Sequence, residues 1–331
     1  MKVLVTGGAG YIGAHIVRLL QRRGDEVIVV DDLVTGIAER ITGAPIVRID
    51  LASDGAVLAL ERLLRDEKVH AVVHLAARKQ VGESVSRAAW YYQQNLGGLA
   101  NLLLAMESAG VGQLVFSSSA AVYGLGDGAL REDDELRPIN PYGETKLAGE
   151  WLVEAATRAF GLSAVSLRYF NVAGAGWPEL GDRMALNLVP MVFERICVDK
   201  SPLIFGDDYE TPDGTCVRDF VHVLDLAEAH MGALDSLRGT GAAHRVFNVG
   251  GGIGSSVRQV IDEIIAVSGT ALSPEVRGRR IGDPATAIAV PDRINSELGW
   301  SATRGLSEII ASAWDSHEHF AVVDGSQRRN Q

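Results

Sequence analysis

Near its beginning the chain reads Val3-Leu4-Val5-Thr6-Gly7-Gly8-Ala9-Gly10-Tyr11-Ile12-Gly13, an apolar run that leads into glycines spaced three residues apart. A buried strand, a glycine-rich turn and a helix that starts inside the turn form the unit that binds the pyrophosphate of a dinucleotide. The turn must be tight, the backbone must approach the phosphates, and the first helical turn supplies free N–H groups. We therefore expect a dinucleotide to lie against Gly7, Gly10, Tyr11, Ile12 and Gly13.

The next apolar run, Val27–Asp31, ends in a carboxylate 18 residues after Gly13. At the end of a strand beside the glycine turn, this carboxylate can accept hydrogen bonds from both hydroxyls of the adenosine ribose. It would also repel a 2′-phosphate. Asp31 therefore predicts NAD, and not NADP, as the cofactor.

Short apolar runs alternate with longer amphipathic ones as far as residue 173. The apolar runs are rich in Val, Leu and Ile, as expected for strands that are buried on both faces of a parallel sheet. We predict strands at Val3–Thr6, Val27–Asp31, Ile46–Asp50, Ala71–His74, Leu114–Ser117 and Ala164–Arg168. We predict helices at Tyr11–Arg23, Ala56–Arg65, Ser86–Ala109 and Tyr142–Phe160. This alternation indicates an α/β fold with a doubly wound parallel sheet of the Rossmann type.

The pattern is less regular after residue 173, where loops rich in Gly, Pro and Asp separate the apolar segments. We expect residues 1–173 to form the NAD-binding domain and residues 174–331 to form a smaller, mixed α/β domain that binds the substrate. Val246–Val249 reads as a strand that returns to the main sheet. The two parts are therefore expected to interleave.

Composition narrows the possible partners. The 331 residues include 31 basic and 42 acidic side chains, a net charge of −11, so nucleic acids and anionic membranes are poor partners. No apolar stretch approaches the ~18 residues of a membrane span. Two cysteines cannot form a disulfide framework, and no Cys/His cluster has zinc spacing. We expect no metal site and a cytoplasmic location.

A candidate catalytic group lies in Tyr142-Gly143-Glu144-Thr145-Lys146, where Tyr142 and Lys146 share one helical face. A tyrosine phenol has an ordinary pKa of about 10, so it acts as a base at neutral pH only beside positive charge. Lys146 and an oxidised nicotinamide ring both supply such charge. Ser117-Ser118-Ser119 ends a predicted strand, where hydroxyls point into the ligand crevice of a parallel sheet. Together these residues indicate a catalytic site.

These motifs resemble the extended short-chain dehydrogenase/reductases and, within them, the UDP-glucose (UDP-galactose) 4-epimerase family. The glycine and Tyr/Lys motifs are typical of the whole superfamily, and the resemblance extends over almost the whole chain. Two segments of the second half, Asp213-Gly214-Thr215 and Arg218-Asp219-Phe220-Val221-His222-Val223, are closer to the epimerases. The other shared segments are Val81–Ser84, Ser117–Gly124, Pro141–Gly143 and Leu167–Asn171.

The resemblance implies an isomerase that inverts C4 of UDP-glucose or UDP-galactose through a transient 4-keto sugar. Tyr142, helped by Ser119, would take the proton of the 4-hydroxyl while the hydride at C4 passes to NAD. Lys146 would hold the nicotinamide ribose. The resemblance also implies a homodimer, in which Ser86–Ala109 and Tyr142–Phe160 pair with their copies.

Positions that match the family's motifs also imply which residues contact NAD and which contact the UDP-sugar. The residues implied to border NAD, besides the glycine turn and Asp31, are Asp50, Leu51, Ala76, Lys79, Asn95, Tyr142, Lys146 and Tyr169. Those implied to hold the UDP-sugar are Lys79, Ser119, Tyr142, Asn171, Asn187, Leu188, Phe205, Arg218, Arg280 and Asp283. Two of these are arginines, which suit a diphosphate in an acidic protein.

Two departures from the family pattern leave the sugar open. Ala287 stands where a bulky tyrosine often closes the sugar pocket, and a wider pocket would admit UDP-N-acetylglucosamine. Arg78 precedes Lys79 where an apolar residue is usual, and two cations facing the pocket would suit the carboxylate of UDP-glucuronic acid. Both sugars remain alternatives to the plain hexoses.

Two other functions on the same fold are less well supported. A nucleotide-sugar 4,6-dehydratase would carry an Asp-Glu pair at the positions of Ala120-Ala121. This chain therefore lacks the acid that elimination needs. A non-catalytic NAD-sensing regulator usually lacks the tyrosine or the lysine of the catalytic pair. This chain has both Tyr142 and Lys146.

Overall fold

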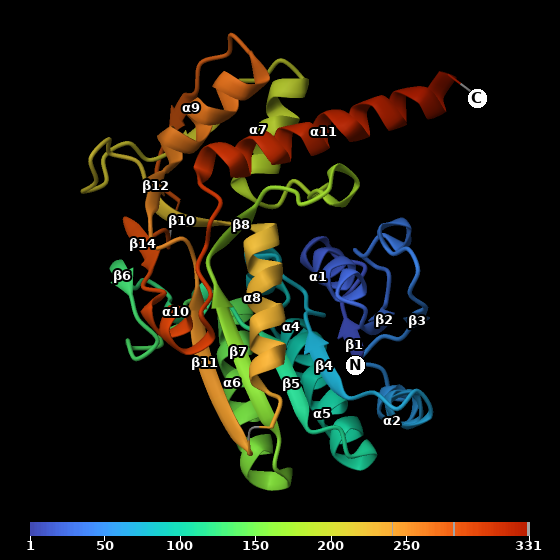
Figure 1. The fold of residues 1–331 in the computed structure, drawn as a ribbon. Coiled ribbons are helices and arrows are strands. Elements are labelled where there is room, and N and C mark those ends of the chain that lie inside the picture. The colour runs from blue at the N-terminus through green and yellow to red at the C-terminus, as the bar shows by residue number, and fades with distance from the viewer. Residues whose placement is uncertain (240, 281, 330–331) are drawn as a thin grey trace.

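The computed structural model describes residues 1–239, 241–280 and 282–329 and is built around a seven-stranded sheet (Figure 1). The strand order is β11-β7-β5-β4-β1-β2-β3, and every neighbouring pair is parallel. The chain winds outward from β1 first in one direction and then in the other, which confirms the doubly wound prediction. The strands are β1 (Lys2–Thr6), β2 (Glu26–Asp31), β3 (Ile46–Arg48), β4 (Ala71–His74), β5 (Gln113–Ser117), β7 (Ser163–Tyr169) and β11 (Ala243–Val249).

Helices cover both faces of this sheet. One face packs against α1 (Tyr11–Arg22) and α8 (Val223–Ser236), and the other against α2 (Ala56–Asp66), α5 (Gly98–Ala109) and α6 (Pro141–Phe160). Each face of the sheet has its own hydrophobic core. Alternate residues of a strand pack into one core or the other, because side chains on a strand point to opposite faces in turn. In β1, for example, Val3 and Val5 belong to the first core and Leu4 to the second. This double burial explains the continuous apolar runs of the sequence.

The segment predicted as one helix over Ser86–Ala109 is interrupted. A short helix, α3 (Val81–Ser86), ends where Arg87 leaves the helical conformation, with φ −131° and ψ 41°. The chain then forms α4 (Ala88–Tyr91), a π-helical segment η2 (Tyr92–Gly97) and α5. The sequence contains no proline here. The apolar periodicity therefore predicted one continuous helix.

A smaller mixed sheet and a helical layer complete the fold, and most of their elements come from the second half of the chain. This sheet has the order β12-β10-β14-β6, with β8 also paired to β10; only the β10–β12 pair is antiparallel among its described pairings. Figure 1 shows α7, α9 and α11 together at one end of the molecule, above the large sheet. The strands of the smaller sheet are β6 (Gly128–Leu130), β8 (Asn171–Ala173), β10 (Val217–His222), β12 (Gly254–Ser256) and β14 (Thr286–Ala289). Two further strands, β9 (Leu203–Phe205) and β13 (Glu275–Arg277), form a separate parallel pair. The helices are α7 (Leu188–Cys197), α9 (Val257–Ser268), α10 (Asp292–Leu298) and α11 (Leu306–Arg329).

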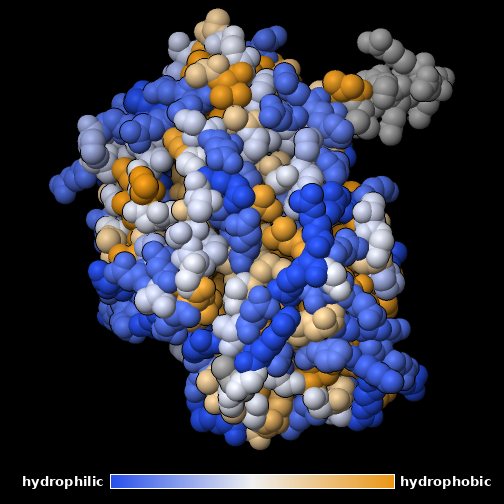
Figure 2. Space-filling model, in the orientation of Figure 1, coloured by the Kyte–Doolittle hydropathy of each residue, from blue (hydrophilic) through white to orange (hydrophobic). Residues whose placement is uncertain are grey.

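Two elements of the second half, α8 and β11, belong to the large sheet layer, because β11 pairs with β7 from Ala243 to Val249. The division of the chain between residues 173 and 174 stays a prediction. The outer surface is mostly hydrophilic in the view of Figure 2, with scattered apolar groups. Over the described ranges, every helix is too short or too polar to cross a bilayer.

Candidate active site

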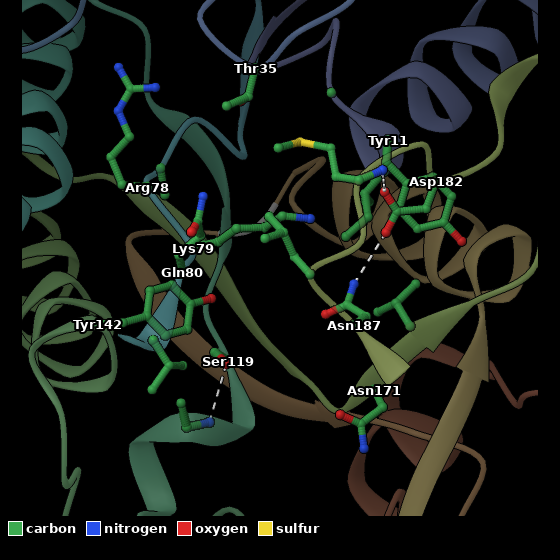
Figure 3. Close-up of a pocket in the computed structure, with 18 of the residues that line it drawn as sticks. Tyr11, Thr35, Arg78, Lys79, Gln80, Ser119, Tyr142, Asn171, Asp182 and Asn187 are labelled. Atoms are coloured by element: carbon green, nitrogen blue, oxygen red, sulfur yellow. Dashed lines mark hydrogen bonds between the residues drawn. The ribbon is translucent and has the colours of Figure 1, made fainter. Parts of the chain in front are cut away.

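A cavity of about 850 Å³ lies between the carboxyl ends of the large-sheet strands and the elements of the second half. Segments far apart in the sequence contribute to its walls, and most of the predicted site residues are among them (Figure 3). The predicted residues that line it are Gly7, Gly10, Tyr11, Ile12, Gly13, Asp31, Asp50, Leu51, Ala76, Lys79, Ser119, Tyr142, Lys146, Tyr169, Asn171, Asn187, Leu188, Phe205, Arg218, Arg280 and Asp283.

The glycine turn opens the first helix toward this cavity. Gly10 is the N-cap of α1 and provides no side chain to bond the first helical N–H groups, which are therefore free for an anion. Gly7 has a φ of +70°, a conformation that favours glycine. A Cβ on Gly13 would lie only 2.3 Å from the Gly7 carbonyl oxygen. The turn can therefore pack against the helix only with glycine at this position.

Asp31 lies at the end of β2 and is 7% exposed. Its carboxylate accepts hydrogen bonds from the backbone N–H groups of Ala9, at 3.0 Å, and Leu33, at 2.9 Å. Burial raises the pKa of Asp31, and these two hydrogen bonds oppose the shift. The remaining acceptor positions of the carboxylate suit ribose hydroxyls, so the glycine turn and Asp31 together fit a dinucleotide.

The start of α6 brings the candidate base into the cavity. The Asn140 side chain caps the helix by accepting a hydrogen bond from the Gly143 N–H at 2.9 Å. A Cβ on Gly143 would lie 2.7 Å from the Ala121 carbonyl oxygen, so glycine lets this helix approach the short helix η3 (Ala120–Tyr123). Tyr142 and Ser119, which caps η3, consequently lie on the same side of the cavity (Figure 3).

Lys146 lies one turn beyond Tyr142 and is buried. Its Nζ donates to the Ser117 carbonyl oxygen at 2.7 Å and lies 6.0 Å from the centre of the Tyr142 ring. Burial lowers the pKa of Lys146 to about 8, although the Glu150 carboxylate acts in the opposite direction. Burial raises the pKa of the Tyr142 phenol, and the Ser119 hydroxyl opposes this shift. The group therefore combines a proton donor or acceptor with a nearby cation whose charge is sensitive to its surroundings.

Two arginines lie on the wall formed by the second half. Arg218 on β10 forms an ion pair with Asp283 at 3.6 Å, and the Arg280 guanidinium lies 3.9 Å from the centre of the Phe205 ring. Both cations line the cavity and suit a ligand that carries a diphosphate.

Two residues do not lie where the sequence placed them. Asn95 is buried behind the wall, where its amide bonds the Arg78 backbone and the Thr145 hydroxyl. The UDP-glucuronic acid alternative required Arg78 to face the sugar; Arg78 lines the cavity, but its guanidinium binds the Asp32 carboxylate at 2.5 Å and points away from Asn171 (Figure 3). Asp32 follows the end of β2, so it attracts Arg78 to the adenosine side of the cavity.

Several lining residues were missed by the sequence reasoning. The lining residues in the loop immediately after Asp31 were predictable, because ligand contacts continue past the end of a strand in this fold. Asp182 had no such signal; its carboxylate accepts from the Met184 N–H and the Asn187 amide and so shapes the loop before α7. The missed residues include Asp32, Thr35, Gly36, Arg40, Asp182, Cys216 and Phe220.

Comparisons with known proteins agree with this arrangement. The model of the NAD dependent epimerase/dehydratase family matches residues 3–250. The UDP-glucose 4-epimerase of Corynebacterium glutamicum is 42% identical over 320 residues, which are 95% of either chain. A solved UDP-glucose 4-epimerase from Stenotrophomonas maltophila, with bound NAD and formylated UDP-arabinopyranose, has a TM-score of 0.91 and 36% identity, and the match covers 98% of this chain and 99% of that one.

A UDP-Glc/GlcNAc 4-epimerase from Campylobacter jejuni has a TM-score of 0.84 and 36% identity, and the match covers 96% of this chain and 99% of that one. These matches confirm the resemblance that the motifs indicated. The chain belongs to the NAD dependent epimerase/dehydratase family.

Proposed function

We propose that the protein is an NAD-dependent isomerase that inverts C4 of a UDP-hexose, interconverting UDP-glucose and UDP-galactose. The observation that carries this proposal is a single cavity that unites the glycine turn, the Tyr142/Lys146 pair and the arginine wall. A dinucleotide, an acid/base group and a diphosphate-bearing sugar can therefore meet in one place. The similar epimerases support the same assignment.

The first half of the chain would hold the cofactor. The free N–H groups at the start of α1 would bind its pyrophosphate, and Asp31 would accept from its adenosine ribose. Asp50, Leu51 and Ala76 lie along the same part of the lining and are proposed to border it. When bound, NAD would supply the acceptor and donor of the hydride at C4 of the sugar.

Tyr142 is proposed to remove the proton of the sugar 4-hydroxyl and to return it after inversion. The positive charge of Lys146 would stabilise the Tyr142 phenolate. The Ser119 hydroxyl is placed to form a hydrogen bond with the Tyr142 phenol oxygen. Between the two transfers, the 4-keto sugar must rotate within the cavity to present its other face. The reaction therefore has no net redox change.

The second half of the chain would hold the nucleotide part of the substrate. Arg218 and Arg280 are proposed to bind the diphosphate, because both cations line the cavity and the carboxylate paired with Arg218, that of Asp283, is 3.6 Å away. The remaining residues proposed to contact the UDP-sugar are Lys79, Asn171, Asn187, Leu188, Phe205 and Asp283.

The choice of sugar is expected to be broad. Ala287 lines the cavity and pairs with Arg218 across β14 and β10, so a small side chain stands beside the diphosphate wall. We expect UDP-N-acetylglucosamine to be accepted as well as the plain hexoses. UDP-glucuronic acid is less well supported, because Arg78 is occupied by Asp32 and leaves Lys79 as the only one of the two expected cations available for a C6 carboxylate.

We further propose a cytoplasmic homodimer. Large apolar side chains are exposed on the two helices that the sequence suggested for pairing: Leu104 on α5 is 53% exposed and Trp151 on α6 is 65% exposed. Burying them against a second copy would remove this apolar surface from water.

Two measurements on the purified protein test the proposal. Denaturation followed by analysis of the released nucleotide is expected to yield NAD, and incubation with a panel of UDP-sugars is expected to produce C4 epimers. Stoichiometric NADP would contradict the role of Asp31. Bound NAD with no epimer from any UDP-sugar would favour the non-catalytic regulator instead.

A further inference from the structure

The third turn on the catalytic face of α6 carries a buried carboxylate that the proposed chemistry does not use. Glu150 follows Tyr142 and Lys146 at intervals of four residues and is 4% exposed. Arg168 on β7, also 4% exposed, donates to it twice, from Nε at 2.9 Å and from Nη2 at 2.7 Å. This bidentate geometry fixes both side chains.

The same ion pair holds the strand end on both sides of Ser119. The Ser118 hydroxyl donates to Glu150 Oε1 at 2.5 Å. Arg168 Nη1 donates to the hydroxyl of Tyr123, at 3.0 Å, and Tyr123 is the last residue of η3. Ser119 therefore lies between two residues that the pair anchors.

Glu150 also acts on Lys146 through its charge. Burial favours the neutral amine of Lys146, and the Glu150 carboxylate, one helical turn away, favours the ammonium. Arg168 lies beyond Glu150 and carries a positive charge that the carboxylate compensates. Removal of Glu150 would therefore leave two like charges in the same buried region.

The other titratable groups around Lys146 share one property: burial keeps them uncharged near neutral pH. It raises the pKa of the phenols and lowers the pKa of the imidazoles, to about 3 on β4 and about 4 on α8. These groups are Tyr142 on α6, Tyr169 on β7, His74 on β4 and His230 on α8. Burial also lowers the pKa of His244 on β11, which faces Glu150 and Arg168. The charge that favours the Lys146 ammonium is therefore the Glu150 carboxylate, whose partner is Arg168.

We propose that Glu150 and Arg168 are a positioning pair for the active site, in which Glu150 maintains the charge of Lys146 and the pair together holds Ser119 in place. The inference rests on the proposed function, because it takes from there the roles of Lys146, Ser119 and Tyr142. Neither member of the pair lines the cavity within the part of the chain that the structure describes. Both therefore act through other residues.

The first test is the pH dependence of kcat for Glu150→Gln. The alkaline limb, where Lys146 loses its proton, is expected to move to lower pH by roughly 1–2 units, the effect of one charge about 6 Å away at an effective dielectric constant of about 20. The matched control is Glu154→Gln, the same change one turn farther along α6, where the side chain is 44% exposed and contacts Arg158 and His244. Its limb is expected to stay in place. A uniform loss of kcat in Glu150→Gln without movement of the limb would overturn the electrostatic role.

The double variant Glu150→Gln/Arg168→Met tests the pair even where the single variant does not fold, because it does not leave the Arg168 guanidinium buried without its carboxylate. Because Glu150 lies nearer to Lys146 than Arg168 does, the alkaline limb of the double variant is still expected to move to lower pH, but by less than in Glu150→Gln. Its kcat is expected to fall roughly tenfold or more, since Ser118 and Tyr123 are no longer held and Ser119 loses its fixed position. A wild-type kcat in the double variant, or a limb displaced farther toward lower pH than that of Glu150→Gln, would overturn the proposal.

Failure of the proposed function would look different, because the wild type itself would then convert no UDP-sugar. The pair is still testable in that case by ultraviolet titration of the Tyr142 phenol, read as the difference between each variant and its Tyr142→Phe counterpart. Glu150→Gln is expected to lower the pKa of Tyr142, because a negative charge has been removed, and Glu154→Gln is expected to leave it unchanged. Equal phenol pKa values in wild type and Glu150→Gln would contradict the inference.

Discussion

At the scale of single residues, the account depends most on Tyr142, because its phenol must exchange a proton with the sugar. Tyr142→Phe removes only the hydroxyl, so kcat is expected to fall about 100-fold or more, the usual contribution of a positioned acid/base group. UDP binding, measured by calorimetry, is expected to survive. The control is Tyr92→Phe, whose hydroxyl bonds Glu144 on the surface at 2.9 Å. Activity of Tyr142→Phe within a few-fold of wild type would remove this residue from the mechanism.

Ala287 is the residue expected to set the breadth of sugar choice. Ala287→Tyr would fill the wall beside the hexose and lower kcat/KM for UDP-N-acetylglucosamine relative to UDP-glucose by roughly tenfold or more. Arg78→Leu serves as the comparison, because the guanidinium binds Asp32 on the adenosine side and its loss should leave sugar preference unchanged. An unchanged preference in Ala287→Tyr, measured with both sugars, would show that another side chain limits the pocket.

At the scale of elements, the glycine turn and α1 act as one unit. Gly13→Ala would place a Cβ 2.3 Å from the Gly7 carbonyl oxygen, so the turn must open, and both the thermal stability and the bound NAD are expected to decrease. The matched control is Gly232→Ala in α8, where an added Cβ meets nothing within 4 Å and a stabilisation of about 0.5–1 kcal/mol is expected. Thermal unfolding and nucleotide content of the two variants check this. A Gly13→Ala variant with full NAD content would contradict the packing argument.

Most large-sheet elements were predictable because their signals are local. Apolar runs such as Ala71–His74 gave strand β4 with its observed bounds, and the glycines after α5 and α6, Gly110 and Gly161, adopt the left-handed conformation of helix ends. The end of α3 at Arg87 was not predictable, because the sequence has no proline or glycine at that position.

The parts of the candidate site that lie within one sequence motif were predictable. The parts whose side-chain positions depend on tertiary contacts were less predictable. Tyr142 and Lys146 share a helix, so their proximity follows from spacing alone. The direction of Arg78 depends on Asp32, 46 residues away, and the role of Asp182 depends on the loop before α7. Charge attraction between distant segments cannot be read from a pattern of apolar and polar positions.

At the scale of the whole molecule, buried histidines predict a loss of stability in mild acid. Burial lowers the pKa of His15, His222 and His230 to about 4 and that of His74 to about 3, against an ordinary value of about 6.5. Between about pH 6.5 and pH 4 the unfolded chain binds protons that the folded chain does not, so the free energy of unfolding falls as the pH falls. Each histidine contributes at most about 1.4 kcal/mol per pH unit. Urea unfolding midpoints that stay constant from about pH 7 to pH 5 would contradict this.

The central claim is that a hydride leaves C4 of a UDP-hexose and returns to it within one closed site. The most direct test is incubation of the purified protein, without added cofactor, with UDP-galactose that carries deuterium at C4. The account predicts UDP-glucose that retains the deuterium at C4, with no net reduction of nicotinamide. Loss of the label to water would show that C4 exchanges as a proton, and absence of UDP-glucose would show that no inversion occurs; either result would contradict the account.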